Sequence, residues 1–123
     1  MPTPIIYTNN HLVKKNFEKN AIFFDTTVFG VFSAIRDIVH VGGKILSHPL
    51  SGSIKPHETP YKSVMILPTK GSLDFNSLNL IETAIGVLNR YPELDFNLPQ
   101  NILNDFAVID LDIMNSAAKE FCV

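Results

Sequence analysis

A polar loop over residues 48–63 holds the densest group of chemically functional side chains in this 123-residue sequence. It contains two histidines, two lysines, five hydroxyl-bearing residues, a glutamate, a glycine and three prolines. Connections longer than about 12 residues are usually functional or disordered. Prolines fix the backbone and reduce the entropy that a loop loses on ordering. We therefore expect a stiffened loop that binds a ligand or a partner.

Within this loop, the run Ser51-Gly52-Ser53 followed by Lys55 is typical of an anion-binding segment. Exposed backbone N–H groups and hydroxyls can hold a phosphate or carboxylate, and a lysine adds a point charge. The run is not a Walker loop, because the Gly-x-x-x-x-Gly-Lys-Ser/Thr spacing is absent. A turn in which serine and glycine serve only the backbone is an equally good interpretation.

The loop histidines are the other chemically versatile groups. His48 lies close in sequence to Ser51 and Ser53, an arrangement that could pair a base with a nucleophile. The chain lacks the Gly-x-Ser-x-Gly nucleophile elbow, however. His57 and Glu58 complete a set of metal-ligand types with His48, but their spacing matches no standard zinc pattern. We expect no metal and no cofactor, and enzymatic activity stays an open question.

More polar residues are expected at the carboxyl ends of strands, where open α/β sheets bind ligands. Asp110 and Asp112 flank the end of the last expected strand. Helix capping alone explains several of these strand-end residues, Asn9, Asn10 and Asp112 among them. The candidate ligand-binding residues from the strand ends and the loop are Thr8, Asn9, Asn10, Asp25, His48, Ser51, Gly52, Ser53, Lys55, Glu58, Tyr61 and Lys62.

Apolar patterning predicts the elements that must position these residues. Strands are expected over residues 4–8, 21–24, 44–47, 63–67 and 106–111, and helices over 12–19, 28–40, 75–91 and 112–121. Asn10, Thr27 or Thr26, and Asp74 are the expected caps, and Gly42-Gly43 is expected to close the second helix. Residues 99–121 stay open between strand plus helix and one long helix, because residues 102, 106, 109, 113 and 117 also form a helical stripe.

Alternation of strands and helices predicts one α/β domain over residues 1–123. We expect a small three-layer sandwich with a mostly parallel sheet of about five strands and helices on both faces. The third and fourth strands have no helix between them, so they are expected to pair antiparallel across the loop.

Composition narrows the class of protein. Apolar residues make up 46% and charged residues 18%, a balance typical of globular chains. Apolar runs fall short of the roughly 20 residues that span a bilayer, and the N-terminus lacks the pattern of a signal peptide. The single cysteine, Cys122, cannot form an internal disulfide. We therefore expect a cytoplasmic protein with no membrane association.

Charge is unevenly distributed along the chain. Residues 1–70 carry eight Lys and Arg against four Asp and Glu, whereas residues 71–123 carry two against eight. Such asymmetry could steer an anionic ligand to the first half or favour head-to-tail association into a homo-oligomer. Well-mixed charge on the folded surface is an equally good interpretation. No basic cluster interleaved with aromatic residues appears, so nucleic-acid binding is not expected.

Three runs carry a family resemblance: Thr8-Asn9-Asn10, the run from Leu46 to Pro56 with its His-Pro-Leu-Ser-Gly-Ser core, and Glu58-Thr59-Pro60-Tyr61-Lys62-Ser63. Together they resemble the GrdX family, small proteins encoded alongside the clostridial glycine, sarcosine and betaine reductase components. The resemblance implies a cytoplasmic accessory or regulatory protein of anaerobic amino-acid fermentation. It implies reductase-complex proteins or a small anionic metabolite such as acetyl phosphate as partners, and no defined reaction.

Two other hypotheses stay open. The chain could be a small enzyme acting on a phosphorylated or carboxylated metabolite, with His48 as acid or base, Lys55 and Lys62 holding the anion, and Asp25 orienting a group. Alternatively, the loop could serve as an interface arm of a homo-oligomer.

Overall fold

The computed structural model describes residues 3–50, 55–91 and 97–121, so Ser51, Gly52, Ser53 and Cys122 lie outside the described residues. The elements in chain order are β1 (Ile5–Thr8), α1 (His11–Asn16), β2 (Ala21–Phe23), α2 (Val28–His40), β3 (Lys44–Ile45), the 3₁₀ helix η1 (Pro56–Glu58), β4 (Ser63–Leu67), α3 (Phe75–Asn89) and α4 (Gln100–Glu120). The α/β class expected from the sequence is confirmed.

The sheet of the described residues has four strands in the order β2-β1-β4-β3. β1 and β2 run parallel, whereas β4 is antiparallel to both β1 and β3. The antiparallel pairing of β3 with β4 is confirmed, but the expectation of about five mostly parallel strands is wrong. β4 follows a long connection without a crossover helix, and it inserts between β3 and β1 instead of extending a parallel edge.

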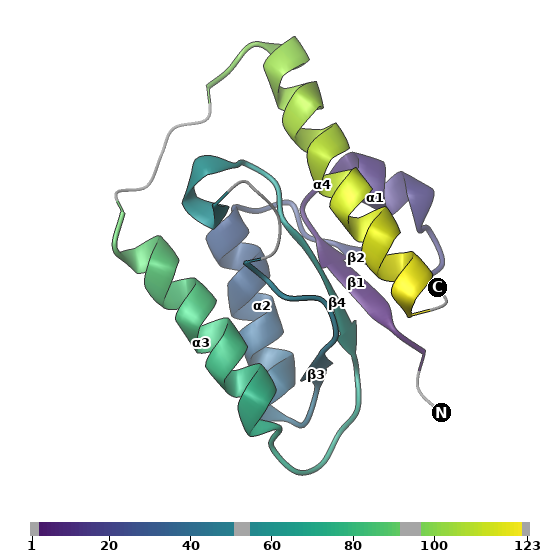
Figure 1. Ribbon diagram of the computed structural model, residues 1–123, viewed down its shortest axis with the longest axis vertical. Coiled ribbons are helices and arrows are strands. Elements are labelled where there is room, and N and C mark those ends of the chain that lie inside the picture. The colour runs from purple at the N-terminus through teal and green to yellow at the C-terminus, as the bar shows by residue number, and fades with distance from the viewer. Residues whose placement is uncertain (1–2, 51–54, 92–96, 122–123) are drawn as a thin grey trace.

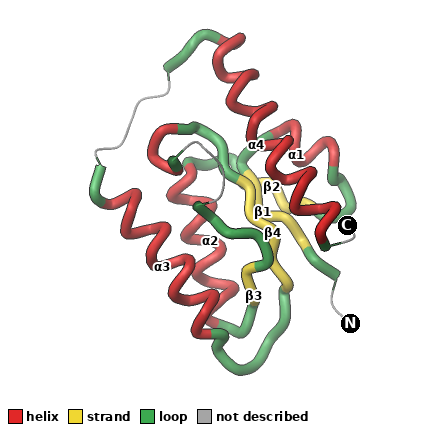
Figure 2. Tube along the Cα trace, viewed as in Figure 1, coloured by secondary structure: helices red, strands yellow, loops and turns green. Residues whose placement is uncertain are grey.

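Helices cover both faces of the sheet, which confirms the three layers. Figure 1 shows α2 and α3 on one side of the strands and α1 and α4 on the other, and Figure 2 shows the same layers by element type. The larger core, built around Phe32, Ile35 and Ile81, fills the space under α2 and α3. A smaller core around Ile6 and Met114 lies under α1 and α4.

Local capping signals place the helix starts as predicted. Asn10 caps α1 by accepting from the backbone N–H of Leu12, and Thr27 caps α2 in the same way. Asp74 caps α3. Gly42 has a φ of 112°, a left-handed conformation that turns the chain from α2 toward β3. None of the helices in the described ranges combines the length and apolar character that crossing a membrane requires.

The last element differs from the preferred prediction. Residues 106–111 are not a strand, and Asp112 does not cap a terminal helix, because α4 runs unbroken from Gln100 to Glu120. The buried residues of α4 recur every three or four positions, as one face of a helix requires. They are Ala107, Asp110, Met114 and Ala118. The single helix that the sequence left open is therefore the observed structure.

Candidate functional site

A buried chain of hydroxyl and carboxylate groups joins β1, β4 and α4. Thr8, the last residue of β1, pairs with Ser63, the first residue of β4, and their hydroxyl oxygens lie 2.6 Å apart. The Ser63 hydroxyl donates to Oδ2 of Asp110 at 2.6 Å, and its backbone N–H donates to Oδ1 at 3.1 Å. Asp110, which is only 4% exposed, thus holds α4 against the end of the sheet.

Asn10 adds a second connection between α4 and the N-terminal elements. Its amide nitrogen donates to Oδ2 of Asp110 at 3.0 Å and to the carbonyl of Ala107 at 2.9 Å. Its amide oxygen caps α1 by accepting from Leu12, and its backbone N–H donates to the Thr8 hydroxyl. One side chain therefore starts α1 and ties it to α4.

Asn9 fixes the end of the polar loop. Its amide nitrogen donates to the carbonyls of Thr26 and Pro60 at 3.0 and 2.9 Å, and its amide oxygen accepts from the backbone N–H of Lys62 at 3.0 Å. A buried amide with these three partners holds residues 60–62 beside the end of β1 and beside the segment after β2.

The start of the loop is also fixed. The Ser47 hydroxyl accepts from the backbone N–H of Met65 at 2.7 Å, so the chain leaving β3 stays against β4. His48 is exposed, and its Nδ1 accepts from the backbone N–H of Leu50 at 3.0 Å. Between the two ends, η1 contacts α3, and Pro56 at its start is buried.

His57 has a packing role. Its ring stacks on the ring of Tyr91 with centroids 3.6 Å apart and planes 6° from parallel. Its Nε2 lies 3.5 Å from a carboxylate oxygen of Glu58, and its Nδ1 has no hydrogen-bond partner among the described residues. In the described ranges no three His, Cys, Asp or Glu side chains gather where they could hold a metal ion.

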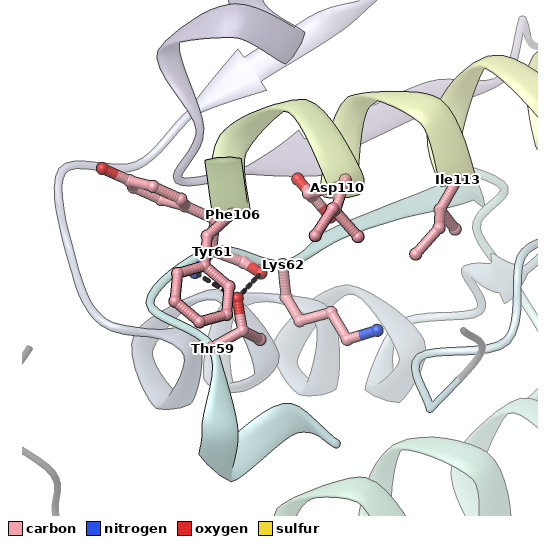
Figure 3. A pocket seen from close by; sticks show the side chains of 7 residues that line it. Thr59, Tyr61, Lys62, Phe106, Asp110 and Ile113 are labelled. Carbon is pink, nitrogen blue, oxygen red and sulfur yellow. Dashed lines mark hydrogen bonds between the residues drawn. The ribbon is translucent and has the colours of Figure 1, made fainter. Parts of the chain in front are cut away.

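A shallow pocket lies between the end of the loop and α4 (Figure 3). It is lined by Thr59, Tyr61, Lys62, Phe106, Ile109, Asp110 and Ile113. The centre of a water molecule can occupy a volume of about 10 Å³ within it. This volume is enough for about one water. The pocket is therefore too small for a metabolite in this conformation.

Lys62 is the buried cation of the site. The residue is 5% exposed. Burial lowers the pKa of its ammonium group because the charged form loses hydration, and the nearby Asp110 carboxylate partly offsets that change. Figure 3 shows the side chain of Lys62 extending away from Asp110. The position of Lys62 therefore favours a structural or binding role over a freely solvated charge.

A model of the GrdX-like protein family matches residues 5–119. The chain belongs to the GrdX-like family. Neither the curated proteins nor the solved structures yield a significant match to it. The matched range runs from the first residue of β1 to the last turn of α4, so the buried network and the loop both lie within the region that defines the family.

The structure brings some of the expected site residues of this GrdX-like chain together and separates others. Five lie at or next to the network and the pocket, namely Thr8, Asn9, Asn10, Tyr61 and Lys62. Four are exposed to solvent, namely Asp25, His48, Lys55 and Glu58. Ser51, Gly52 and Ser53 lie outside the described residues. The strand-end residues are bonded to one another and to the loop backbone, so they position the loop.

Sequence reasoning missed two residues of the network in this family member. The apolar pattern predicts Ser63 only as the start of a strand, although a hydroxyl at a buried strand end has to find a partner. The same pattern predicts Asp110 near the correct sheet edge but on a strand instead of a helix. The signal that could have found it is its position three residues after Ala107 and four before Met114, on the buried face of α4.

Proposed function

We propose that this GrdX-like protein is a cytoplasmic accessory or regulatory component of glycine or betaine reductase metabolism that works by binding through the loop over residues 48–63. Membership of the GrdX-like family supports the link to glycine reductase. The ligand class we favour is a small anionic metabolite such as acetyl phosphate, and reductase-complex proteins are the alternative partners.

One observation carries the proposal: the polar residues at the strand ends hold the loop in place. Asn9 bonds the carbonyl of Pro60 and the N–H of Lys62, while Asp110 bonds Ser63 at the point where the loop becomes β4. A loop fixed at its end by buried hydrogen bonds loses less entropy when it binds. Lys55 is exposed on this loop and supplies a positive charge for an anion.

A binding role fits the site better than catalysis does. His48, the expected acid or base of an enzyme, uses Nδ1 to accept a hydrogen bond within its own turn. The hydroxyls of Thr8 and Ser63 are bonded to each other, and the Ser63 hydroxyl also donates to Asp110. Thr8 is 0% and Ser63 6% exposed, so neither hydroxyl is open to a substrate.

The test is a thermal-shift titration of the purified protein with phosphate, acetyl phosphate, glycine and betaine. A ligand present at 100 times its dissociation constant adds about 2.7 kcal/mol to the free energy of unfolding. We expect acetyl phosphate to raise the melting temperature, Lys55→Ala to abolish the rise, and Lys19→Ala to preserve it, because Lys19 is exposed outside the loop. A rise that persists in Lys55→Ala would contradict an anion site at the loop.

A complementary measurement separates the two kinds of partner. Purified reductase subunits would be mixed with the protein and analysed by size-exclusion chromatography, with and without acetyl phosphate. Co-elution without any ligand-induced thermal shift would assign the loop to a protein partner. Absence of both effects would refute the proposed role.

A further inference from the structure

α4 carries a second apolar stripe, which belongs neither to the hydrophobic cores nor to the buried hydrogen-bond network. Ile102, Phe106, Ile109 and Ile113 follow one another at helical spacing of four, three and four residues. Neither hydrophobic core includes any of them. Ile102 is 37% exposed and Ile109 39% exposed. A face with three isoleucines and a phenylalanine thus lies beside the face that α4 buries.

This stripe forms one wall of a groove. The residues that line the shallow pocket from α4 are Phe106, Ile109, Asp110 and Ile113, and those from the end of the loop are Thr59, Tyr61 and Lys62 (Figure 3). Figure 1 shows the N-terminal half of α4 continuing past the end of the strands, where the sheet no longer covers it. The stripe therefore extends from the pocket onto the part of α4 that lies beyond the strands.

The charged residues that border the groove indicate which kind of partner it binds. Asp105 lies three residues after Ile102 and Asp112 three residues after Ile109, so both border the same side of the stripe, and both are exposed. Residues 100–118 contain no Lys, Arg or His. An occupant whose apolar residues fill the groove thus meets exposed negative charges on the α4 side. The cation that lines the groove from the loop side, Lys62, is buried, with 5% of it exposed.

We propose that this α4 groove docks an amphipathic helix of another protein, one whose apolar stripe is bordered by lysine or arginine. A helix that binds in a groove anchors it with apolar residues at i, i+3 or i+4, and i+7. The apolar stripe of α4 offers such anchors an apolar wall at helical spacing. Basic residues along the border of that helix complement Asp105 and Asp112 and speed association.

A second copy of this chain is a poorer occupant. Antiparallel pairing of two α4 helices about a twofold axis places Asp105 of one copy and Asp112 of the other on the same side of the interface. Like charges set opposite one another destabilise such a contact. The exposed carboxylates of Asp105 and Asp112 therefore favour a basic partner over self-association.

Helix docking on α4 deepens the proposed accessory role, and it rests on that role because an accessory protein acts by binding other molecules. The two can fail separately, because the loop ligand depends on Lys55 and the helix depends on the α4 stripe. If the protein binds the helix but shows no thermal shift with anions, the result would support helix docking and not the anion site.

The experiment uses the full chain and a fluorescein-labelled synthetic helix whose leucines recur at i, i+4, i+7 and i+11 and whose bordering positions are lysines. The control helix carries glutamates at the same bordering positions. Fluorescence anisotropy measures both dissociation constants. We expect the lysine helix to bind at least about tenfold more tightly than the glutamate helix, a difference of 1.4 kcal/mol. Equal affinity of the two helices, or no binding of either, would overturn the proposal.

Two neighbouring exposed residues provide a matched pair of variants. Ile109→Ser removes an anchor of the stripe, and we expect about a tenfold loss of affinity for the lysine helix. Val108→Ser removes a neighbouring apolar side chain that is 47% exposed, against 39% for Ile109, and that points about 100° away around the helix axis. We expect Val108→Ser to bind like the wild type, and equal losses in the two variants would argue against a stripe-specific site.

Sedimentation and melting curves complete the test. Wild type and both variants should melt at the same temperature, because neither Val108 nor Ile109 belongs to a core. A wild-type dimer that Ile109→Ser dissociates would show that a second copy occupies the groove, and that result would overturn the proposal of a basic helical partner.

Discussion

Removing the Asp110 side chain tests whether the buried network holds α4 on the sheet. Its carboxylate accepts three hydrogen bonds, from the backbone N–H and the hydroxyl of Ser63 and from the amide of Asn10. Asp110→Ala deletes all three bonds without adding bulk. The variant also removes the carboxylate that partly supports the charge of Lys62, so it should lower the pKa of Lys62 further.

The loss in the free energy of unfolding caused by Asp110→Ala depends on the hydrogen bonds that each donor keeps. The Ser63 hydroxyl keeps its contact with Thr8, and the Asn10 amide keeps the carbonyl of Ala107, so each of them loses only part of its bonding. The backbone N–H of Ser63 loses the carboxylate acceptor, and a buried unsatisfied donor costs about 1–3 kcal/mol. With the two weakened bonds added, we expect a loss of about 3 kcal/mol, within the range for breaking a buried polar network.

The assay is thermal and urea unfolding of the wild type, Asp110→Ala and Asp112→Ala. For a chain of this size a loss of about 3 kcal/mol lowers the melting temperature by roughly 10 °C. Asp112 is exposed on the same helix, so its removal should change stability by no more than about 0.5 kcal/mol. Equal melting temperatures for the two variants would refute the idea that the network anchors α4.

A double-mutant cycle isolates the bond between β4 and α4. Ser63→Ala and Asp110→Ala should each destabilise the protein, while the combined variant should lose less than the sum. We expect a coupling free energy of about 1 kcal/mol, because residues that share a hydrogen bond are coupled by roughly 0.5–3 kcal/mol. Strict additivity would mean that the two side chains contribute independently, despite the 2.6 Å between the Ser63 hydroxyl and the Asp110 carboxylate.

Three further predictions concern a buried charge and two glycines. The lowered pKa of Lys62 means that the unfolded chain binds its proton more tightly, so the wild type should gain stability relative to Lys62→Met as the pH rises toward 10.5, the ordinary pKa of lysine, as paired melting curves would show. A pH-independent difference would contradict this. Gly42→Ala should destabilise the protein by more than about 1 kcal/mol, because φ is +112° and the new Cβ would lie 2.5 Å from a backbone nitrogen. Gly86→Ala, in open space within α3, should stabilise it by up to about 1 kcal/mol in urea unfolding.

The parts of the fold that depend on local signals could be predicted from the sequence. Asn10, Thr27 and Asp74 accept hydrogen bonds from backbone N–H groups within the next three residues, so residue type and position sufficed to place three helix starts. Strand order depends on distant pairing, such as that of Ile5 with Ile66. No local pattern indicates that β4 inserts beside β1, and the alternation of strands and helices favoured a parallel sheet instead.

The candidate site was predictable in its residues near β1 and not in its partner on α4. Thr8, Asn9 and Asn10 follow a clear strand, and a ligand-binding edge is expected there. Asp110 meets Ser63 across 47 positions of sequence, and its own neighbourhood resembles a β-strand because Val108 and Ile109 are β-branched. Tertiary packing overrode that local preference.

α4 also reverses the usual relation between hydrophobicity and burial. Its buried residues are two alanines, one methionine and Asp110, with Leu111 and Ala117 partly buried against the core, whereas its adjacent, partly exposed stripe carries three isoleucines and Phe106. A helix that served only to cover the sheet would bury its most apolar face. Here the carboxylate of Asp110 fixes the rotation of the helix through bonds to Ser63 and Asn10, and the more apolar face turns toward the end of the loop. This orientation costs favourable burial within the monomer, so we infer that the stripe gains its burial from a partner.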